Sequence, residues 1–136
     1  MAQVGLVVVS HSRALADAAV ELARQMLPGR ELAIEVAAGT EDGGLGTDAV
    51  AISEAITTAD AGDGVVVLMD LGSAVLSAET ALELLDDDLR DRVLLSAAPL
   101  VEGLIGAAVV AAGGADRARV DAEAQLGLAP KQAHLK

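Results

Sequence analysis

His11 stands at a position where a side chain can do chemistry. It follows an apolar, β-branched run at residues 4–9 and precedes a helical stripe of apolar residues that begins at Leu15. The imidazole therefore lies between the end of a predicted strand and the start of a helix, whose free N–H groups favour negative charge. A lone histidine can equally be a cap or a loop residue, so its role depends on what lies beside it.

Asp70 is the carboxylate that could orient this imidazole. It directly follows the apolar run 65–69, which is typical of a strand buried on both faces. If this strand pairs with the strand before His11, Asp70 can accept the N–H of one ring nitrogen. The other nitrogen, Nε2 in our prediction, is then left as a free nucleophile. The alternative is that Asp70 only caps the helix that follows it.

Small and polar residues in the same loops predict an anion pocket around His11. Glycine permits close approach of a backbone, and hydroxyl groups beside a helix N-terminus can hold an anion. Ser73 is also expected to be the N-cap of the helix after Asp70. The glycine-rich segment 39–48 is expected to form a flexible rim, or else an exposed connection with no further role. The predicted anion-binding residues are Ser12, Gly39, Thr40, Gly72 and Ser73.

The glycine-rich segment also overlaps a relaxed dinucleotide fingerprint at Gly44, Gly46 and Ala49. The fingerprint belongs after the first strand of a dinucleotide-binding unit, whereas this segment follows the second predicted strand. Acidic residues at positions 41, 42 and 48 would also crowd a pyrophosphate. We therefore discount dinucleotide binding, and the sequence contains neither a G-x-x-x-x-G-K-[ST] P-loop nor a G-x-S-x-G nucleophile elbow.

Alternating strand and helix patterns position these loops. β-Branched or alternating runs predict four strands, at residues 4–9, 32–37, 65–69 and 92–96. Apolar residues at helical spacing predict helices at 15–26, 52–59, 78–85, 100–112 and 116–125. The predicted fold class is α/β: a doubly wound, open, mainly parallel four-stranded sheet with helices on both faces. We expect a single domain at 1–127 and a polar, unstructured tail at 128–136.

The composition of the 136 residues excludes several classes of function. A formal net charge of -12 opposes binding to nucleic acid, and the absence of Phe, Tyr and Trp removes stacking platforms. There is no Cys, and His11 is far from His134 in the chain, so no metal site is expected. No signal-peptide pattern and no long uninterrupted apolar run occur, so the cytoplasm is the expected location.

The segment 100–112 is apolar nearly all round and carries one charge, Glu102. A helix packed on one face of a sheet buries a stripe of only about 100°. The remaining apolar surface has to be covered by the core or by a second subunit, and the helix predicted at 116–125 offers only small apolar residues for that purpose. We therefore expect a homodimer that covers this helix.

Four segments together resemble a known family: 5–12, the glycines and threonines within 39–47, 68–74, and 98–103. They are similar to the phosphotransferase subunits of bacterial dihydroxyacetone kinases, which belong to the mannose-type IIA domains of the sugar phosphotransferase system. The resemblance implies that His11 takes a phosphoryl group from the phosphocarrier HPr and passes it to ADP. That ADP is bound on the nucleotide-binding subunit of the kinase. It also implies the strand order 2-1-3-4, which makes the strands before His11 and Asp70 neighbours. It further implies that the five anion-binding residues bind the phosphoryl group, that no cofactor is needed and that the protein is a cytoplasmic homodimer.

Two alternatives remain open from the sequence. A non-catalytic, flavodoxin-like module that binds an anion or senses one would use the same loops but would give His11 no acceptor role. A mannose-type IIA domain of sugar transport is the other alternative. It is less favoured, because the loop at Leu71, Gly72 and Ser73 is shorter and less glycine-rich than the broader mannose-type pattern, and no long C-terminal extension is present to exchange a strand between subunits.

Overall fold

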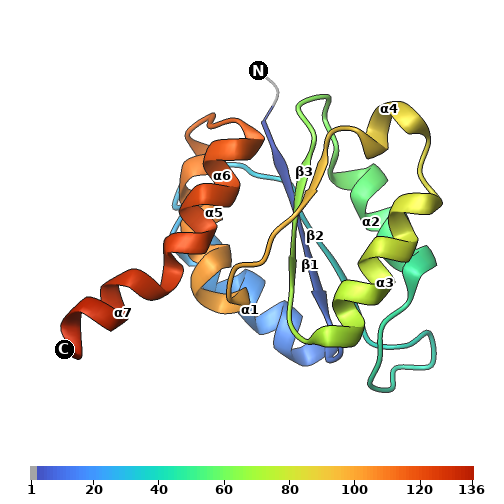
Figure 1. Cartoon of the computed structure of the whole chain (residues 1–136), viewed down its shortest axis with the longest axis horizontal. Coiled ribbons are helices and arrows are strands. Elements are labelled where there is room, and N and C mark those ends of the chain that lie inside the picture. The colour runs from blue at the N-terminus through green and yellow to red at the C-terminus, as the bar shows by residue number, and fades with distance from the viewer. Residues whose placement is uncertain (1–2) are drawn as a thin grey trace.

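A parallel sheet of four strands forms the centre of the protein. The computed structural model describes residues 3–136 and orders the strands β2-β1-β3-β4 (Figure 1). All three strand pairs are parallel, so the predicted α/β fold and strand order are confirmed. The two central strands, β1 and β3, are buried along their whole length. The strand bounds are Gly5–Ser10 for β1, Ile34–Ala38 for β2, Val65–Met69 for β3 and Val93–Leu95 for β4.

Helices cover both faces of the sheet and make a three-layer structure. In Figure 1, α1, α5 and α6 lie on one side of the strands and α2, α3 and α4 on the other. The side chains of β1 alternate between the two layers: Leu6 and Val8 belong to the first core, Val7 and Val9 to the second. The helix bounds are Arg13–Gln25 for α1, Ala49–Ala59 for α2, Gly72–Glu83 for α3, Asp87–Arg90 for α4, Leu100–Ala112 for α5 and Arg117–Gln125 for α6.

Without aromatic residues, the core is closed by small side chains that let elements approach one another. The buried faces of the helices are rich in alanine. Gly5 shows how close the approach is: a Cβ at this position would lie 2.2 Å from the carbonyl oxygen of Ala59. The end of α2 therefore rests directly on the backbone of β1, which only glycine permits.

Two short helices were not predicted. In α4, the Asp86 side chain accepts a hydrogen bond from Leu89 N at 2.9 Å and caps the helix, while Leu89 itself is buried. The tail predicted to be unstructured, 128–136, instead contains the helix α7, Ala129–His134, which follows a 3-10 turn at Leu126–Leu128. Pro130 suits the first turn of α7 because its missing N–H is not needed there.

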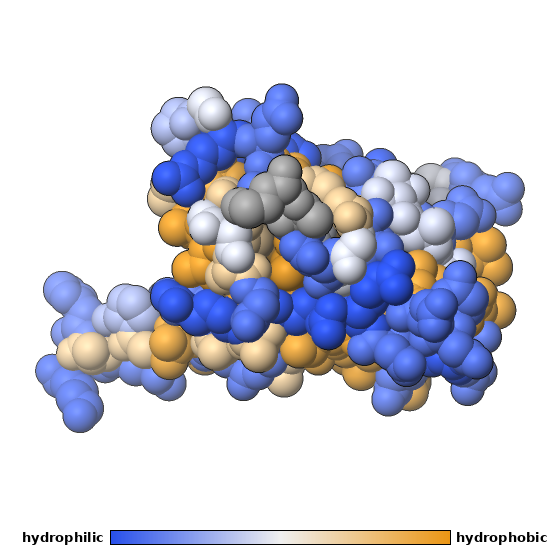
Figure 2. All heavy atoms as spheres, turned by 90° about the horizontal axis from the view of Figure 1, so that it is seen from above, coloured by the Kyte–Doolittle hydropathy of each residue, from blue (hydrophilic) through white to orange (hydrophobic). Residues whose placement is uncertain are grey.

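Helix α7 projects away from the three layers (Figure 1). Figure 2, seen from the end of the molecule where the strands begin, shows the same projection to the left of a largely hydrophilic surface. A contact of 2.7 Å between Lys131 Nζ and Glu102 Oε2 joins α7 to α5, and it holds the pKa of Glu102 below its usual range. The charged residue that stands alone in the apolar α5 thus pairs with the tail.

Helix α5 is packed between α1 and α6. Val120 and Ala124 of α6 are fully buried, so this helix covers more of α5 than its small apolar residues suggest. Val109 remains 46% exposed, and Val101 and Ile105 are half-buried. Within residues 3–136, no helix is both long and apolar enough to cross a lipid bilayer.

Candidate active site

His11 lies in the two-residue connection between β1 and α1, at the carboxyl end of the central strand. Ser12 is the N-cap of α1, and its hydroxyl accepts a hydrogen bond from Leu15 N at 3.2 Å. Three of the four loops that follow the strands meet at this edge of the sheet. The His11 side chain is 26% exposed, so one part of the ring is held by the protein and another is open to solvent.

The imidazole is in direct contact with Asp70. Nδ1 of His11 lies 2.8 Å from Oδ1 of Asp70. The contact follows from the sheet order, because β1 and β3 are neighbours and Val9 pairs with Met69, two residues before His11 and one before Asp70. An ionised carboxylate only accepts hydrogen bonds, so the ring proton sits on Nδ1 and Nε2 of the neutral imidazole carries a lone pair.

Asp70 is held as an anion by a set of donors. Oδ1 also accepts from Leu71 N at 2.6 Å, and Oδ2 accepts from His11 N and from Ser10 Oγ, both at 2.9 Å. Burial of the side chain, which is 10% exposed, acts to raise the pKa of Asp70. The hydrogen bonds from His11 N, Leu71 N, the His11 ring and Ser10 outweigh burial, so the pKa lies below its usual value.

Ser73 contacts the other ring nitrogen. Its hydroxyl forms a short hydrogen bond with Nε2 of His11. The prediction that Ser73 caps α3 is wrong: the N-cap is Leu71, without a side-chain hydrogen bond, and Ser73 is the second residue of the helix. Its side chain is turned to the imidazole instead. The first N–H groups of α3, including those of Gly72 and Ser73, have no partner within the helix and are available to an anion.

The loop after β2 supports His11 through its backbone. Gly39 N donates to Ser10 O at 3.2 Å, and Gly46 N donates to His11 O at 2.9 Å. Gly39 is buried and has a φ of 75°, a conformation that favours glycine. These contacts place Gly39 beside Ser10 and His11, where its backbone helps to set the path of the loop.

The hydroxyl of Thr40 is used inside this loop. It forms a short hydrogen bond with the Asp42 carboxylate, which lowers the pKa of Asp42, and it accepts from Gly44 N at 3.0 Å. Among residues 3–136, no hydrogen bond joins Thr40 to His11 or Asp70. The structure therefore does not bring the Thr40 hydroxyl to the imidazole, although the two residues share the same edge of the sheet.

Sequence reasoning missed two side chains. Ser10 is fully buried and bonded to Asp70, and the signal for it was a polar residue at the end of an otherwise apolar strand. Thr47 Oγ1 lies 2.6 Å from Ser77 Oγ and 3.5 Å from Ser73 O, which fastens the loop after β2 to α3. Thr47 is among the residues that carry the family resemblance, but no local pattern gave it this role, because its partners lie on a distant helix.

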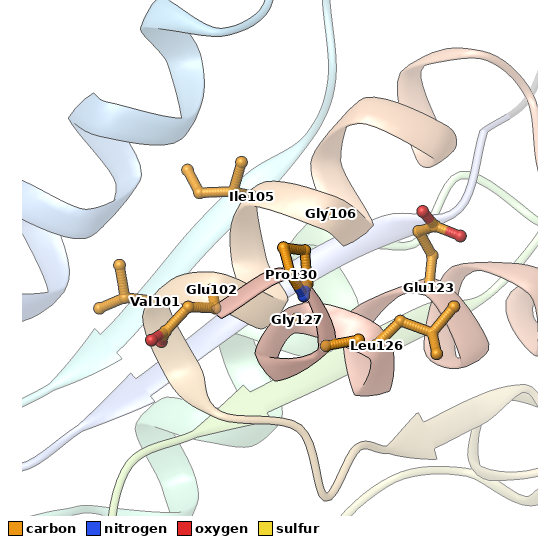
Figure 3. Close-up of a pocket in the computed structure, with 9 residues that line it drawn as sticks. Val101, Glu102, Ile105, Gly106, Glu123, Leu126, Gly127 and Pro130 are labelled. Atoms are coloured by element: carbon orange, nitrogen blue, oxygen red, sulfur yellow. The ribbon is translucent and has the colours of Figure 1, made fainter. Parts of the chain in front are cut away.

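A separate apolar groove lies between α5, α6 and the C-terminal segment (Figure 3). Its volume is about 580 Å³, and none of the residues that line it is a predicted site residue. Figure 3 shows Pro130 and Gly127 on one side and Ile105 and Gly106 on the other. Within the described residues 3–136, no three His, Asp or Glu side chains are grouped so that they could hold a metal ion.

Comparison with known proteins gives this site a context. Residues 5–121 match the model of the EIIA-man family, described as the PTS system fructose IIA component. The "PEP-dependent dihydroxyacetone kinase, phosphoryl donor subunit DhaM" of Escherichia coli is 50% identical over 97% of this chain and 28% of its own length. The chain thus spans about a quarter of that relative. The "PEP-dependent dihydroxyacetone kinase 2, phosphoryl donor subunit DhaM" of Listeria innocua is 42% identical over 78% of this chain and 84% of its own.

Solved structures show the same architecture. One titled "unknown function protein EF1359" has a TM-score of 0.81 and 39% identity, and the match covers 90% of this chain and 93% of that one. A sigma-54 interaction domain protein from Enterococcus faecalis has a TM-score of 0.72 at 16% identity, over 98% and 96% of the two chains, which shows the fold alone. The resemblance to mannose-type IIA domains and to dihydroxyacetone kinase subunits is confirmed. With a family match over residues 5–121 and these relatives, the chain belongs to the EIIA-man family, the PTS system fructose IIA components.

Proposed function

We propose that this chain is a phosphohistidine phosphotransferase that relays a phosphoryl group through Nε2 of His11 to a dihydroxyacetone kinase. The observation that carries the proposal is the contact of 2.8 Å between His11 Nδ1 and Asp70 Oδ1. It assigns the ring proton to one nitrogen and leaves the other as a nucleophile. Relatives named as phosphoryl donor subunits of PEP-dependent dihydroxyacetone kinases support the choice of acceptor.

The transfer needs no net movement of a proton on His11. In the first step, the bond between phosphorus and the histidine nitrogen of phosphorylated HPr breaks, and the Nε2 lone pair forms the new bond. Nδ1 keeps its proton, so the ring becomes cationic, and the Asp70 carboxylate beside it balances the charge. In the second step, a terminal phosphate oxygen of ADP takes the phosphoryl group, ATP forms, and the ring returns to its neutral state.

The oxygens of the phosphoryl group would be held by the start of α3. The Ser73 hydroxyl donates to Nε2 in the free protein, and it would turn to a phosphoryl oxygen once Nε2 is bonded to phosphorus. The N–H groups of Gly72 and Ser73 and the positive end of the α3 dipole would stabilise the added negative charge. Ser12 would do the same at the start of α1, while Gly39 and Thr40 would shape the loop that borders the phosphoryl group.

The proposed partners are phosphorylated HPr as donor and the ADP-binding subunit of a dihydroxyacetone kinase as acceptor. The net charge of -12 would favour docking onto a carrier that is basic around its own histidine. We further propose a cytoplasmic homodimer that binds neither nucleic acid nor membrane.

The test is incubation with phosphorylated HPr, followed by intact-mass measurement. We expect the mass of one phosphoryl group to be added and then lost when ADP-loaded dihydroxyacetone kinase is supplied. A module that only binds or senses an anion would gain no covalent mass. A sugar-transport IIA domain would gain it but keep it in the presence of the kinase, so either outcome would contradict the proposal.

A further inference from the structure

Ser10 is a buried polar residue whose hydroxyl donates its hydrogen bond to the Asp70 carboxylate. It is the last residue of β1 and is fully buried. Its Oγ lies 3.1 Å from Ser12 N and 2.9 Å from Asp70 Oδ2. A backbone N–H can only donate, so Oγ accepts from Ser12, and the single hydroxyl proton is directed to the Asp70 carboxylate.

This bond holds one oxygen of the carboxylate so that the other keeps its place at the imidazole. Oδ2 accepts from Ser10 Oγ, at the last residue of β1, and from His11 N, at the first residue of the connection that follows. Oδ1 then faces His11 Nδ1 at 2.8 Å. Without the hydroxyl, Oδ2 would lose one of its two donors, and the carboxylate could rotate away from the ring.

We propose that Ser10 is a positioning residue for phosphoryl transfer: its hydroxyl locks the Asp70 carboxylate, which keeps the His11 proton on Nδ1 and leaves Nε2 as the acceptor. The inference rests on the proposed function. Ser10 touches none of the reacting atoms and acts only through Asp70. Outer groups that orient a metal-ligating histidine change metal affinity or activity by about 10- to 100-fold when they are removed, and we expect an effect of the same order for Ser10.

The chain contains a matched control. Ser96 directly follows β4 and is 2% exposed. Its hydroxyl accepts a hydrogen bond from Ala98 N at 3.2 Å, two residues further on, just as the Ser10 hydroxyl accepts from Ser12 N. Among the hydrogen bonds of residues 3–136, none joins the Ser96 hydroxyl to a carboxylate. Replacing Ser96 therefore removes a buried strand-end hydroxyl and its turn without touching Asp70.

The experiment compares Ser10→Ala, Ser10→Thr and Ser96→Ala in a chain that also carries His134→Gln. Because the chain has two histidines, His11 then supplies the only imidazole signals. We would measure the ring tautomer by ¹⁵N-resolved NMR and the rate of phosphoryl transfer from phosphorylated HPr. For Ser10→Ala we expect a smaller share of the Nδ1–H tautomer and transfer slowed by about tenfold or more. Ser10→Thr, which keeps a hydroxyl, should restore both, and Ser96→Ala should match the parent.

Unchanged tautomer and rate in Ser10→Ala would overturn the inference, and so would an equal loss in Ser96→Ala, which would assign the effect to the turn. If Ser10→Ala does not fold, the same two measurements are made on Ser10→Cys, because a thiol fills the space of the hydroxyl but is a weak hydrogen-bond donor. Parental behaviour of Ser10→Cys would then count against the role. If the parent takes no phosphoryl group from HPr, the proposed function fails, while the tautomer measurement still tests the role of Ser10.

Discussion

His11 combines a fixed proton on one nitrogen with an accessible lone pair on the other. Asp70 supplies the first property and is itself held as an anion by its hydrogen bonds. The second property comes from the position of the ring at the strand end, where 26% of the side chain is exposed. The proposed relay needs both, because His11 would have to meet a donor protein and an acceptor in turn.

Replacing His11 with Gln should abolish the incorporation of acid-labile, base-stable phosphate, because glutamine has no nucleophilic ring nitrogen. The measurement is labelling from phosphorylated HPr followed by acid and base treatment. His134→Gln is the control: His134 lies at the exposed end of α7, away from Asp70, and its loss should leave labelling unchanged. Residual labelling of the His11 variant would show that another residue accepts the phosphoryl group.

Replacing Asp70 with Ala should slow phosphoryl transfer in both directions by about 10- to 100-fold while the protein still folds. The reason is that the Nδ1 proton loses its acceptor, so the ring can turn and can carry its proton on Nε2. Stopped-flow measurement of transfer from HPr and back to it would give both rates. Transfer at the parental rate would mean that another group orients the imidazole.

At the level of elements, neighbouring strands bring His11 and Asp70 together. At the opposite end of the sheet, an ion pair joins the start of β4 to the end of α2. Arg92, just before β4, reaches Asp60 at the end of α2 with Nη2–Oδ2 at 2.7 Å and Nε–Oδ1 at 3.1 Å. Two parallel hydrogen bonds between a guanidinium and a carboxylate are stronger than a single hydrogen bond between neutral groups. The Arg92 guanidinium holds the pKa of Asp60 below its usual value, against the opposing effect of burial.

This ion pair predicts how stability depends on pH. Because the pKa of Asp60 is depressed in the folded state, its contribution is fully present above the unfolded value, about 3.9, and is lost as the pH falls through the lower folded value. Asp60→Asn should therefore lower the free energy of unfolding at pH 7, and its difference from the parent should shrink below about pH 4. Urea unfolding at several pH values would measure this. A difference that is the same at pH 3 and pH 7 would contradict it.

At the scale of the whole molecule, the layer of α1, α5 and α6 leaves apolar surface uncovered. The groove beside α5 is lined by Val101, Ile105 and Leu126, and Leu126 is 58% exposed. Exposed apolar surface that is gathered in one groove is more typical of an interface than of a free surface. This is the surface we assign to the proposed homodimer.

Sedimentation equilibrium at micromolar concentration should give twice the mass of one chain. Ile105→Glu should give a single chain, because the added carboxylate would have to be buried in the interface. Leu84→Glu is the control, since Leu84 is 54% exposed on the opposite layer. A single-chain mass for the parent, with Ile105→Glu folded as well, would show that the α5 surface needs no second subunit.

The architecture and the central pair of the site were predictable from the sequence. Hydrophobic periodicity is a property of neighbouring residues, so the patterns around His11 and Asp70 identified both strands and the helices behind them. The sheet order then predicted that the two residues meet, and their side chains do. The short α4 and α7 escaped prediction because four and six residues are too few to show a helical period.

Only the tertiary structure decided which hydroxyl groups face the imidazole and its carboxylate. The bonds of Ser10 with Asp70 and of His11 with Ser73 join residues 60 and 62 positions apart, and no local pattern records such distances. Ser73 therefore faces the ring rather than capping its helix, the Thr40 hydroxyl turns into its own loop, and Ser10 is a donor to Asp70. The physical reason is that the direction of a hydroxyl is set by whichever donors and acceptors the folded chain brings within about 3 Å.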